Sequence, residues 1–159
     1  MRLSTKSRYG VRALFDIAYH SQGAPAQIKE ISRRQGITPR YLEQIFQRLK
    51  RAGIITSIRG PKGGYYLSRK PDEIVLSEIV EAMDESIDPV FCAADCKGRR
   101  KRCRRESKCV AQAVWRETGQ RIREYWDSIS LSRMCRMAAE LGFEGSDRSA
   151  ASNRKPRRK

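Results

Sequence analysis

The feature that most constrains the fold is the segment 28–67, where two short amphipathic helical patterns precede a glycine-rich hairpin pattern. The first pattern, with Ile28 and Ile31 facing inward, stops at Gln35-Gly36. Thr38-Pro39 then gives a strong start signal, because threonine is a frequent N-cap and proline favours the first helical position. The second pattern, residues 39–51, repeats its apolar residues at i, i+3, i+4 and i+7: Leu42, Ile45, Phe46 and Leu49. This spacing predicts two helices joined by a tight turn.

Further elements flank the helix pair. A helix is predicted before it, from about Ser4 to Ser21, and residues 54–58, 59–64 and 65–67 indicate strand, turn and returning strand. Three helices followed by a hairpin with a basic tip is the order of a winged helix-turn-helix. The alternative is an unspecific helical bundle. In a helix-turn-helix the second helix of the pair lies in the major groove of DNA.

The charge pattern also favours a polyanionic partner. The chain carries 34 basic and 18 acidic residues, a net charge of +16 over 159 residues. Residues 1–71 have a net charge of +12, residues 97–108 of +7 and residues 148–159 of +6, while the remainder is acidic. Such a division favours contacts with phosphates. No apolar run approaches the roughly 20 residues that span a bilayer, so we expect a cytoplasmic chain with no membrane partner.

The second half of the chain predicts a short helix over residues 77–84, a long one from Cys109 or Val110, and a last one over residues 131–141. The long helix carries an apolar stripe that needs a partner surface, for which a second subunit is the economical answer; packing on its own winged domain is the alternative. We expect a mainly α fold, a winged helix-turn-helix with a long C-terminal dimerisation helix. The stripe consists of Val110, Val114, Ile122, Trp126 and Ile129.

This pattern predicts four regions. Residues 1–84 form the winged helix-turn-helix DNA-binding domain, and residues 85–109 form a cysteine-rich loop that binds a cluster. Residues 110–141 form the dimerisation helices, and residues 142–159 form a disordered basic tail.

Four of the five cysteines fall within 18 residues: Cys92, Cys96, Cys103 and Cys109. Clustered thiols in a reducing compartment more often bind a metal than form a disulfide framework. The gap of five residues before Cys109 is loose for structural zinc, whereas iron–sulfur clusters accept more varied spacings, so the spacing favours a cluster without excluding zinc. Cys135 sits in a separate apolar pattern and indicates core packing.

The predicted DNA-binding residues fall into three groups. The outer face of the helix at 39–51 offers arginine and glutamine for base readout, and a carboxylate that accepts from cytosine or excludes wrong sequences. The hairpin tip and the chain's first residues would contact phosphates. The full set is Ser4, Lys6, Arg8, Thr38, Arg40, Tyr41, Glu43, Gln44, Gln47, Arg48, Arg59 and Lys62.

Several motifs together resemble the iron–sulfur cluster regulator family, IscR. They are residues 1–9 (MRLSTKSRY), 41–46 (YLEQIF), 59–65 (RGPKGGY) and 84–86 (DES), and the pair Lys108-Cys109 with Trp115 downstream. The resemblance covers roughly residues 1–141. It implies a homodimeric winged-helix transcription factor of the Rrf group that binds promoter DNA. It also implies a cluster on the loop between the winged domain and the dimerisation helix, where it controls DNA binding.

The ligand pattern departs from this family. IscR-type proteins typically use three cysteines and a histidine; Cys92, Cys103 and Cys109 match the cysteines, but Gln112 stands at the histidine position. We hypothesise that Cys96, in an inserted segment, replaces the histidine. Related nitric-oxide sensors take a fourth ligand from near the amino terminus, but Arg8 stands where that carboxylate would be. The resemblance favours [2Fe–2S] over [4Fe–4S], although four cysteines can hold either.

Two alternatives remain at this point. The first is the same DNA-binding fold with a zinc site or a thiol–disulfide switch in place of the cluster. An iron–sulfur enzyme or electron carrier is the second, and the sequence argues against it because no glycine loop for phosphate and no acid–base pair with His20 is present. We therefore expect a regulator rather than an enzyme.

Overall fold

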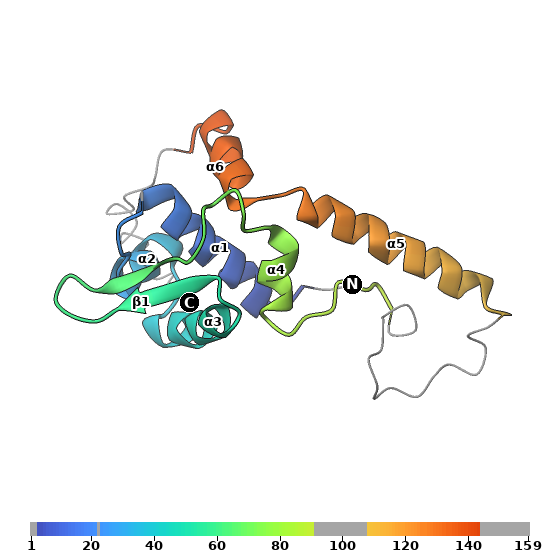
Figure 1. The fold of residues 1–159 in the computed structure, drawn as a ribbon, viewed down its shortest axis with the longest axis horizontal. Helices are drawn as coiled ribbons and strands as arrows, with labels where there is room; N and C mark the ends of the chain where they lie inside the picture. The colour runs from blue at the N-terminus through green and yellow to red at the C-terminus, as the bar shows by residue number, and fades with distance from the viewer. Residues whose placement is uncertain (1–2, 22, 91–107, 144–159) are drawn as a thin grey trace, which may run out of the picture.

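The computed structural model describes residues 3–21, 23–90 and 108–143. Within these ranges the chain is mainly helical, with one small two-stranded sheet, and the order of elements is the predicted one (Figure 1). Cys92, Cys96 and Cys103, most of the basic stretch 97–108 and the tail from residue 144 lie outside the described residues. The elements are α1 (Thr5–His20), α2 (Ile28–Gln35), α3 (Pro39–Arg51), β1 (Ile55–Ile58), β2 (Gly64–Leu67), α4 (Leu76–Glu81), α5 (Val110–Asp127) and α6 (Leu131–Glu140).

The predicted helix starts and stops of the first three helices are confirmed to within a residue. Ser4 is the N-cap of α1, and its Oγ accepts hydrogen bonds from the backbone N–H groups of Lys6 (3.1 Å) and Ser7 (3.4 Å). Gly36 ends α2 in the left-handed region, with φ 64°. Pro39 begins α3 as expected, but Thr38 caps it only through its backbone carbonyl, because its side chain makes no capping hydrogen bond.

A buried ion pair joins α1 to α2. Asp16 is fully buried, and its carboxylate accepts from Arg34 Nη2 at 2.7 Å and from Gln35 Nε2 at 2.9 Å. A carboxylate in a core is tolerated when it is paired and hydrogen-bonded in this way. The pair fixes the angle at which α2 leaves α1.

The hairpin is the predicted wing. Its first strand begins one residue later than predicted, because the N–H of Ile54 donates to Leu49 O and closes the end of α3. β1 pairs antiparallel with β2 in the register Ile55↔Leu67 to Ile58↔Gly64. Its turn needs glycine at two positions. Gly60 has φ 121°, and a Cβ on Gly63 would lie 2.3 Å from the carbonyl oxygen of Ile58.

The main core lies between α1, α2, α3 and the root of the wing, and it includes residues from both ends of the chain. Phe46, Leu14 and Leu131 are each fully buried in it. Leu131 begins α6, which packs on α1, and its N–H donates to Ile74 O at 3.0 Å. In the described chain α6 is thus an integral part of the body around α1.

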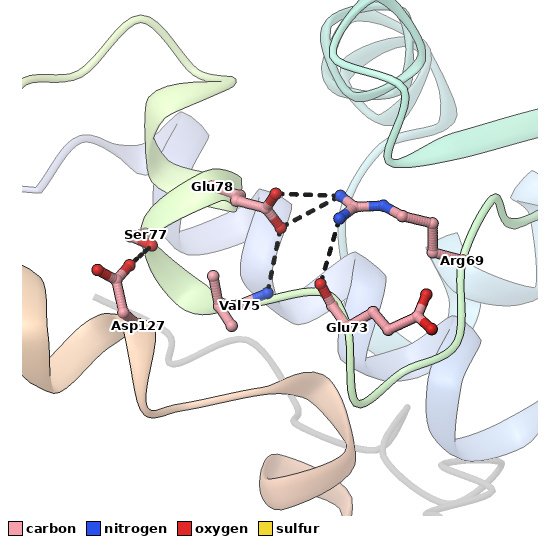
Figure 2. A network of polar contacts seen from close by, with 6 residues as sticks. All are labelled: Arg69, Glu73, Val75, Ser77, Glu78 and Asp127. Atoms are coloured by element: carbon pink, nitrogen blue, oxygen red, sulfur yellow. Dashed lines mark hydrogen bonds and ion pairs between the residues drawn. The ribbon is translucent and has the colours of Figure 1, made fainter.

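α4 ends three residues before its predicted range does and begins one residue earlier. The carboxylate of Glu78 accepts from Val75 N–H at 3.3 Å and from Arg69 at 3.2 Å, which fixes the start of the helix (Figure 2). Ser77 donates to Asp127 at the end of α5. α4 ends early because Asp84 adopts the left-handed region, φ 59°, which a helix cannot continue through.

The apolar stripe expected along α5 is split between two opposite sides of the helix. Trp126 and the following Ile129 are buried on the body, whereas Val110 and Val114 are 80% and 54% exposed. A spacing of four residues drifts by roughly 40° per step on a helix of 3.6 residues per turn, so positions 110 and 126 face roughly 160° apart. The expectation of one continuous stripe was wrong for this reason. The N-terminal part of α5 projects away from the body (Figure 1).

Candidate nucleic-acid interface and cysteine loop

The outer face of α3 carries the side chains predicted for base readout. The opposite face of α3 is buried, so its register is fixed by the core. Of the predicted residues, Arg40, Glu43, Gln44 and Gln47 are exposed, and Tyr41 and Arg48 are partly buried. Thr38 is exposed at the start of the helix.

A groove of about 340 Å³ runs along this face of α3 and brings α1 into the same surface. Lys6 is the α1 residue in its lining, opposite Gln44, Gln47 and Arg48 of α3. The structure therefore brings together one predicted phosphate-contacting residue and several predicted base-reading ones. Arg51 also lines the groove, and the predicted set lacks it; its i+4 spacing from Gln47 is the signal that would have found it.

Aromatic contacts set the position of Tyr41. The rings of Tyr9 and Tyr41 meet edge to face, with centroids 5.8 Å apart. The guanidinium of Arg12 lies 5.3 Å from the Tyr9 ring centre, and its Nε donates to Gln35 at 3.1 Å. The Tyr9–Tyr41 contact joins the start of the candidate recognition helix to α1.

The wing presents its predicted cations at the tip of the hairpin. Arg59 and Lys62 are both exposed there. Lys50 at the end of α3 donates to Ser57 Oγ of β1 at 2.8 Å, and Ala26, which precedes α2, pairs with Tyr65 of β2 near the turn of the hairpin. These bonds hold the wing at a fixed place relative to α3. The wing tip and the α3 face are two surfaces suited to contact one polyanion.

The N-terminal residues of the predicted DNA-binding set differ in their exposure and in their hydrogen bonds. Arg8 is exposed and donates to Thr5 Oγ1 at 3.3 Å. Ser4 is occupied as a cap, and its backbone N–H donates to the carboxylate of Glu85 at 3.2 Å. Ser7 Oγ donates to the same carboxylate at 2.6 Å.

A segment that we call the connector, residues 84–90, follows α4 and contacts three helices. Asp84 forms an ion pair with Arg48 of α3, and Glu85 binds the start of α1. Ile87 is buried with Val80 and Trp126. Burial alone would raise the pKa of Glu85, but hydrogen bonds from Ser4 and Ser7, helped by the charge of Lys6, lower it overall. In the sequence, residues 84–86 stand out only through the resemblance to the IscR family, and no local pattern signals the role of the connector.

Cys109 is the predicted ligand that lies within the described chain, and it is the N-cap residue of α5. Its side chain is partly buried, and its carbonyl accepts from Gln112 N–H at 3.1 Å. Cys109 therefore stands at the junction between the cysteine-rich loop and an 18-residue helix. Gln112 is buried one turn further on. No group of three or more His, Cys, Asp and Glu that could hold a metal occurs within the ranges that the structure describes.

Cys135 was expected in the core, but it is a partly buried side chain of α6 that belongs to neither cluster of buried core residues in the described chain. Burial raises the pKa of its thiol. None of the helices in the described ranges is long and apolar enough to cross a membrane.

The sequence matches a family model, Rrf2, described as an iron-dependent transcriptional regulator, over residues 3–137. The chain is 43% identical to the HTH-type transcriptional regulator IscR of Photorhabdus laumondii over 145 residues, which is 91% of this chain and 85% of that protein. It is 40% identical to the IscR of Xenorhabdus nematophila, with 98% and 94% covered.

Solved structures agree with this relationship. The fold is similar to T. potens IscR, with a TM-score of 0.69, 35% identity, and 89% of this chain and 90% of that chain covered. It is similar also to CymR, described as the global cysteine regulator of B. subtilis, with a TM-score of 0.69, 27% identity, and 86% and 98% covered. These relatives are regulators of transcription, which confirms the expected winged helix-turn-helix and the expectation of a regulator rather than an enzyme. The chain belongs to the Rrf2 family of transcriptional regulators.

Proposed function

We propose that this protein is a dimeric regulator that binds promoter DNA through α3 and the wing, under the control of an iron–sulfur cluster on the loop before α5. The observation that carries the DNA-binding part is the groove in which Lys6 of α1 meets Gln44, Gln47 and Arg48 of α3. Arginine and glutamine on one exposed helix face are the residue types that read guanine and adenine in the major groove. The proposal includes a cytoplasmic location, because a DNA-binding regulator needs access to DNA and cysteine ligands need a reducing compartment.

Each predicted residue receives a role in this proposal. The bases are read by the α3 face, with Glu43 as the residue that rejects wrong sequences. The phosphates are bound at the edges, by Ser4, Lys6, Arg8 and Thr38 on one side and by the wing tip on the other. The base-reading residues are Arg40, Tyr41, Gln44, Gln47 and Arg48, and the wing residues are Arg59 and Lys62.

The exposed apolar side of α5 supports a homodimer. Val110, Val114 and Tyr125 are 80%, 54% and 60% exposed, on the side of the helix away from buried Gly119 and Trp126. Large apolar side chains in one band on a projecting helix mark a protein interaction surface. A second copy is the partner that fits a helix-turn-helix, since two copies match two half-sites on one face of the duplex.

The cluster is proposed on four thiolates: Cys92, Cys96, Cys103 and Cys109. Cys109 at the N-terminus of α5 supports this ligand set, and the IscR relatives support an iron–sulfur cluster, with [2Fe–2S] favoured. When bound, such a cluster supplies a group whose charge and occupancy respond to electrons and iron. Cys109 sits next in sequence to α5, so ligation also restrains the start of the proposed dimerisation helix.

The cluster proposal is tested by anaerobic purification followed by visible absorption, iron and sulfide analysis of wild type and Cys96→Ser. The expected wild type is brown, with matching iron and sulfide, and Cys96→Ser is bleached. The matched control is Cys135→Ser, which removes a thiol from α6 and should keep the colour. A coloured Cys96→Ser contradicts the fourth ligand. A colourless wild type that contains zinc, or that forms a disulfide, contradicts the cluster and supports the alternative switch on the same fold.

The DNA-binding proposal is tested by selecting a duplex from a random pool with the purified protein and titrating it by fluorescence anisotropy. Gln44→Ala is expected to relax the sequence preference at one base pair by about 1–3 kcal/mol, whereas Lys6→Gln weakens all duplexes alike and lowers the salt slope by about 1. Binding that is equal for every sequence, and unchanged in both variants, contradicts the proposal.

A further inference from the structure

The connector places a carboxylate on a cation of the proposed DNA groove. Arg48 lines the groove together with Lys6, Gln44 and Gln47. Its Nη1 is paired with Asp84, which lies outside α3, in the connector. Side-chain exposure is 33% for Arg48 and 79% for Asp84, so the pair lies at the surface, where phosphates have access.

The position of Asp84 is set by the surrounding fold. Its N–H donates to Glu81 O at 2.9 Å, and its backbone is left-handed, with φ 59°. The next residue, Glu85, binds the N-terminus of α1 through Ser4 and Ser7. Ile87 is then fixed in a buried cluster with Trp126. Anchors on α1 and α5 thus keep the Asp84 carboxylate beside α3.

We propose that Asp84 sets the DNA affinity by competing with DNA for Arg48. A guanidinium paired with a carboxylate offers a phosphate less net positive charge, and its Nη1 donor is not available to a base or a phosphate until that pair is broken. The ion pair therefore makes the DNA affinity of the groove lower than it would be if Arg48 were unpaired. This proposal deepens the proposed function and rests on it, because it assigns Asp84 as a residue that positions a DNA-binding side chain without contacting DNA itself.

The exposure of the Arg48–Asp84 ion pair limits how much it can change the DNA affinity. Exposed ion pairs contribute about 0.2–1 kcal/mol, which corresponds to a factor of up to about five in affinity. Release of one cation to the phosphates also steepens the dependence of log K on log salt by up to about 0.9. Both effects are within the range of a careful titration.

The test variant is Asp84→Asn, because asparagine tolerates the left-handed backbone and keeps the size of the side chain while removing its charge. The control is Glu81→Gln, which makes the same charge change one turn earlier, where the carboxylate pairs with Arg123 of α5 and does not line the groove. Circular dichroism and thermal unfolding establish that both variants are folded. The probe is the duplex selected by the wild-type protein, titrated by fluorescence anisotropy at several salt concentrations.

The expected result is a two- to fivefold lower Kd for Asp84→Asn with a steeper salt slope, and little change for Glu81→Gln. The same substitution in an Arg48→Gln background should have no effect, because the competed side chain is gone. An unchanged Kd for Asp84→Asn, or an equal gain in the Arg48→Gln background, overturns the inference while leaving the proposed function standing. Failure of the wild type to select any duplex overturns both.

Discussion

At the scale of single residues, Glu85 joins the connector to the first helix. Its pKa is lower in the folded protein than the ordinary value of 4.5, since the hydrogen bonds from Ser4 and Ser7 outweigh the effect of burial. A carboxyl whose pKa is lowered by folding stabilises the protein above its unfolded pKa. That stabilisation is lost as the pH falls through the folded pKa.

The corresponding prediction concerns Glu85→Gln. At pH 7 the variant should be less stable than wild type by about 1 kcal/mol, because a charged acceptor is replaced by a neutral one. The difference should begin to shrink as the pH falls below about 4.5, where the carboxyl of the unfolded chain takes up a proton, and it should be lost once the pH is below the lower pKa of the folded protein. Urea unfolding at a series of pH values measures it. A difference that is constant from pH 7 to pH 3 would show that the charge of Glu85 plays no part.

Asp16 gives a second prediction at this scale. The Asp16→Ala variant leaves Arg34 without its buried carboxylate, and the expected loss of stability is about 3–5 kcal/mol. The control is Glu117→Ala, which removes an exposed carboxylate that pairs with Arg121 and should cost well under 1 kcal/mol. Chemical denaturation measures both. Equal effects would contradict a structural role for the buried pair.

These two residues also show what the sequence could predict and what it could not. Ser4, Gly36 and Pro39 were placed correctly because caps and turns depend on neighbours in the chain. The partners of Asp16 lie 18–19 residues away and those of Glu85 78–81 residues away, so only the folded chain brings them together. The outer face of α3 was predictable because its buried face is periodic. Three of the four proposed cluster ligands are not in the described chain, so that part of the site stays a prediction.

At the scale of elements, the wing turn depends on glycine. A Cβ on residue 63 would lie 2.3 Å from Ile58 O and 2.9 Å from Gly60 O, both backbone atoms. Gly63→Ala should displace the hairpin tip that carries Arg59 and Lys62, and loss of two phosphate contacts lowers the salt slope of DNA binding by up to about 2. Fluorescence anisotropy against salt concentration measures this slope.

The control for the wing is Gly10→Ala in α1. A Cβ there would make an ordinary contact of 3.6 Å with Met83, so the same chemical change is accommodated. Its salt slope should equal that of wild type. If Gly63→Ala binds DNA with the wild-type slope, the wing has no part in phosphate binding.

α5 is the element on which the proposed dimer depends. Val114→Glu places a charge in the exposed apolar band, and it should halve the molecular mass in solution without unfolding the protomer, because Val114 contacts little within one chain. Gln120→Glu adds the same charge at an exposed position outside the band and should leave the mass unchanged. Sedimentation velocity measures both. A wild type that already sediments as a protomer would contradict the dimer.

The apolar stripe on α5 was mispredicted because of its four-residue spacing. Residues spaced by four give a continuous apolar pattern in the sequence, yet on the helix they turn steadily from the outer side at Val110 to the inner side at Trp126. The alternative of packing on the protein's own domain is therefore confirmed for one part of the stripe, whereas the dimer role of the other part stays a prediction. The Trp126 part packs on the protein's own body, and the exposed Val110 part is left for the proposed partner.

At the scale of the whole molecule, the fold links the candidate DNA surface to the start of the cysteine loop. α3, α1 and α5 are joined through the connector by the contacts of Asp84, Glu85 and Ile87. The loop that follows leads to Cys109 at the start of α5. Occupancy of a cluster there would act on both the proposed dimer helix and the connector. We therefore propose that the cluster and the DNA site are thermodynamically coupled.

The most direct test is the DNA affinity of one anaerobic preparation before and after removal of its cluster, with visible absorption recorded on the same samples. The account predicts that Kd for the selected duplex changes by a factor of about 5–150 when the colour is lost, which corresponds to a coupling of about 1–3 kcal/mol. The Cys96→Ser variant should match the cluster-free sample throughout. Identical affinities and salt slopes for the coloured and bleached samples would contradict the claim.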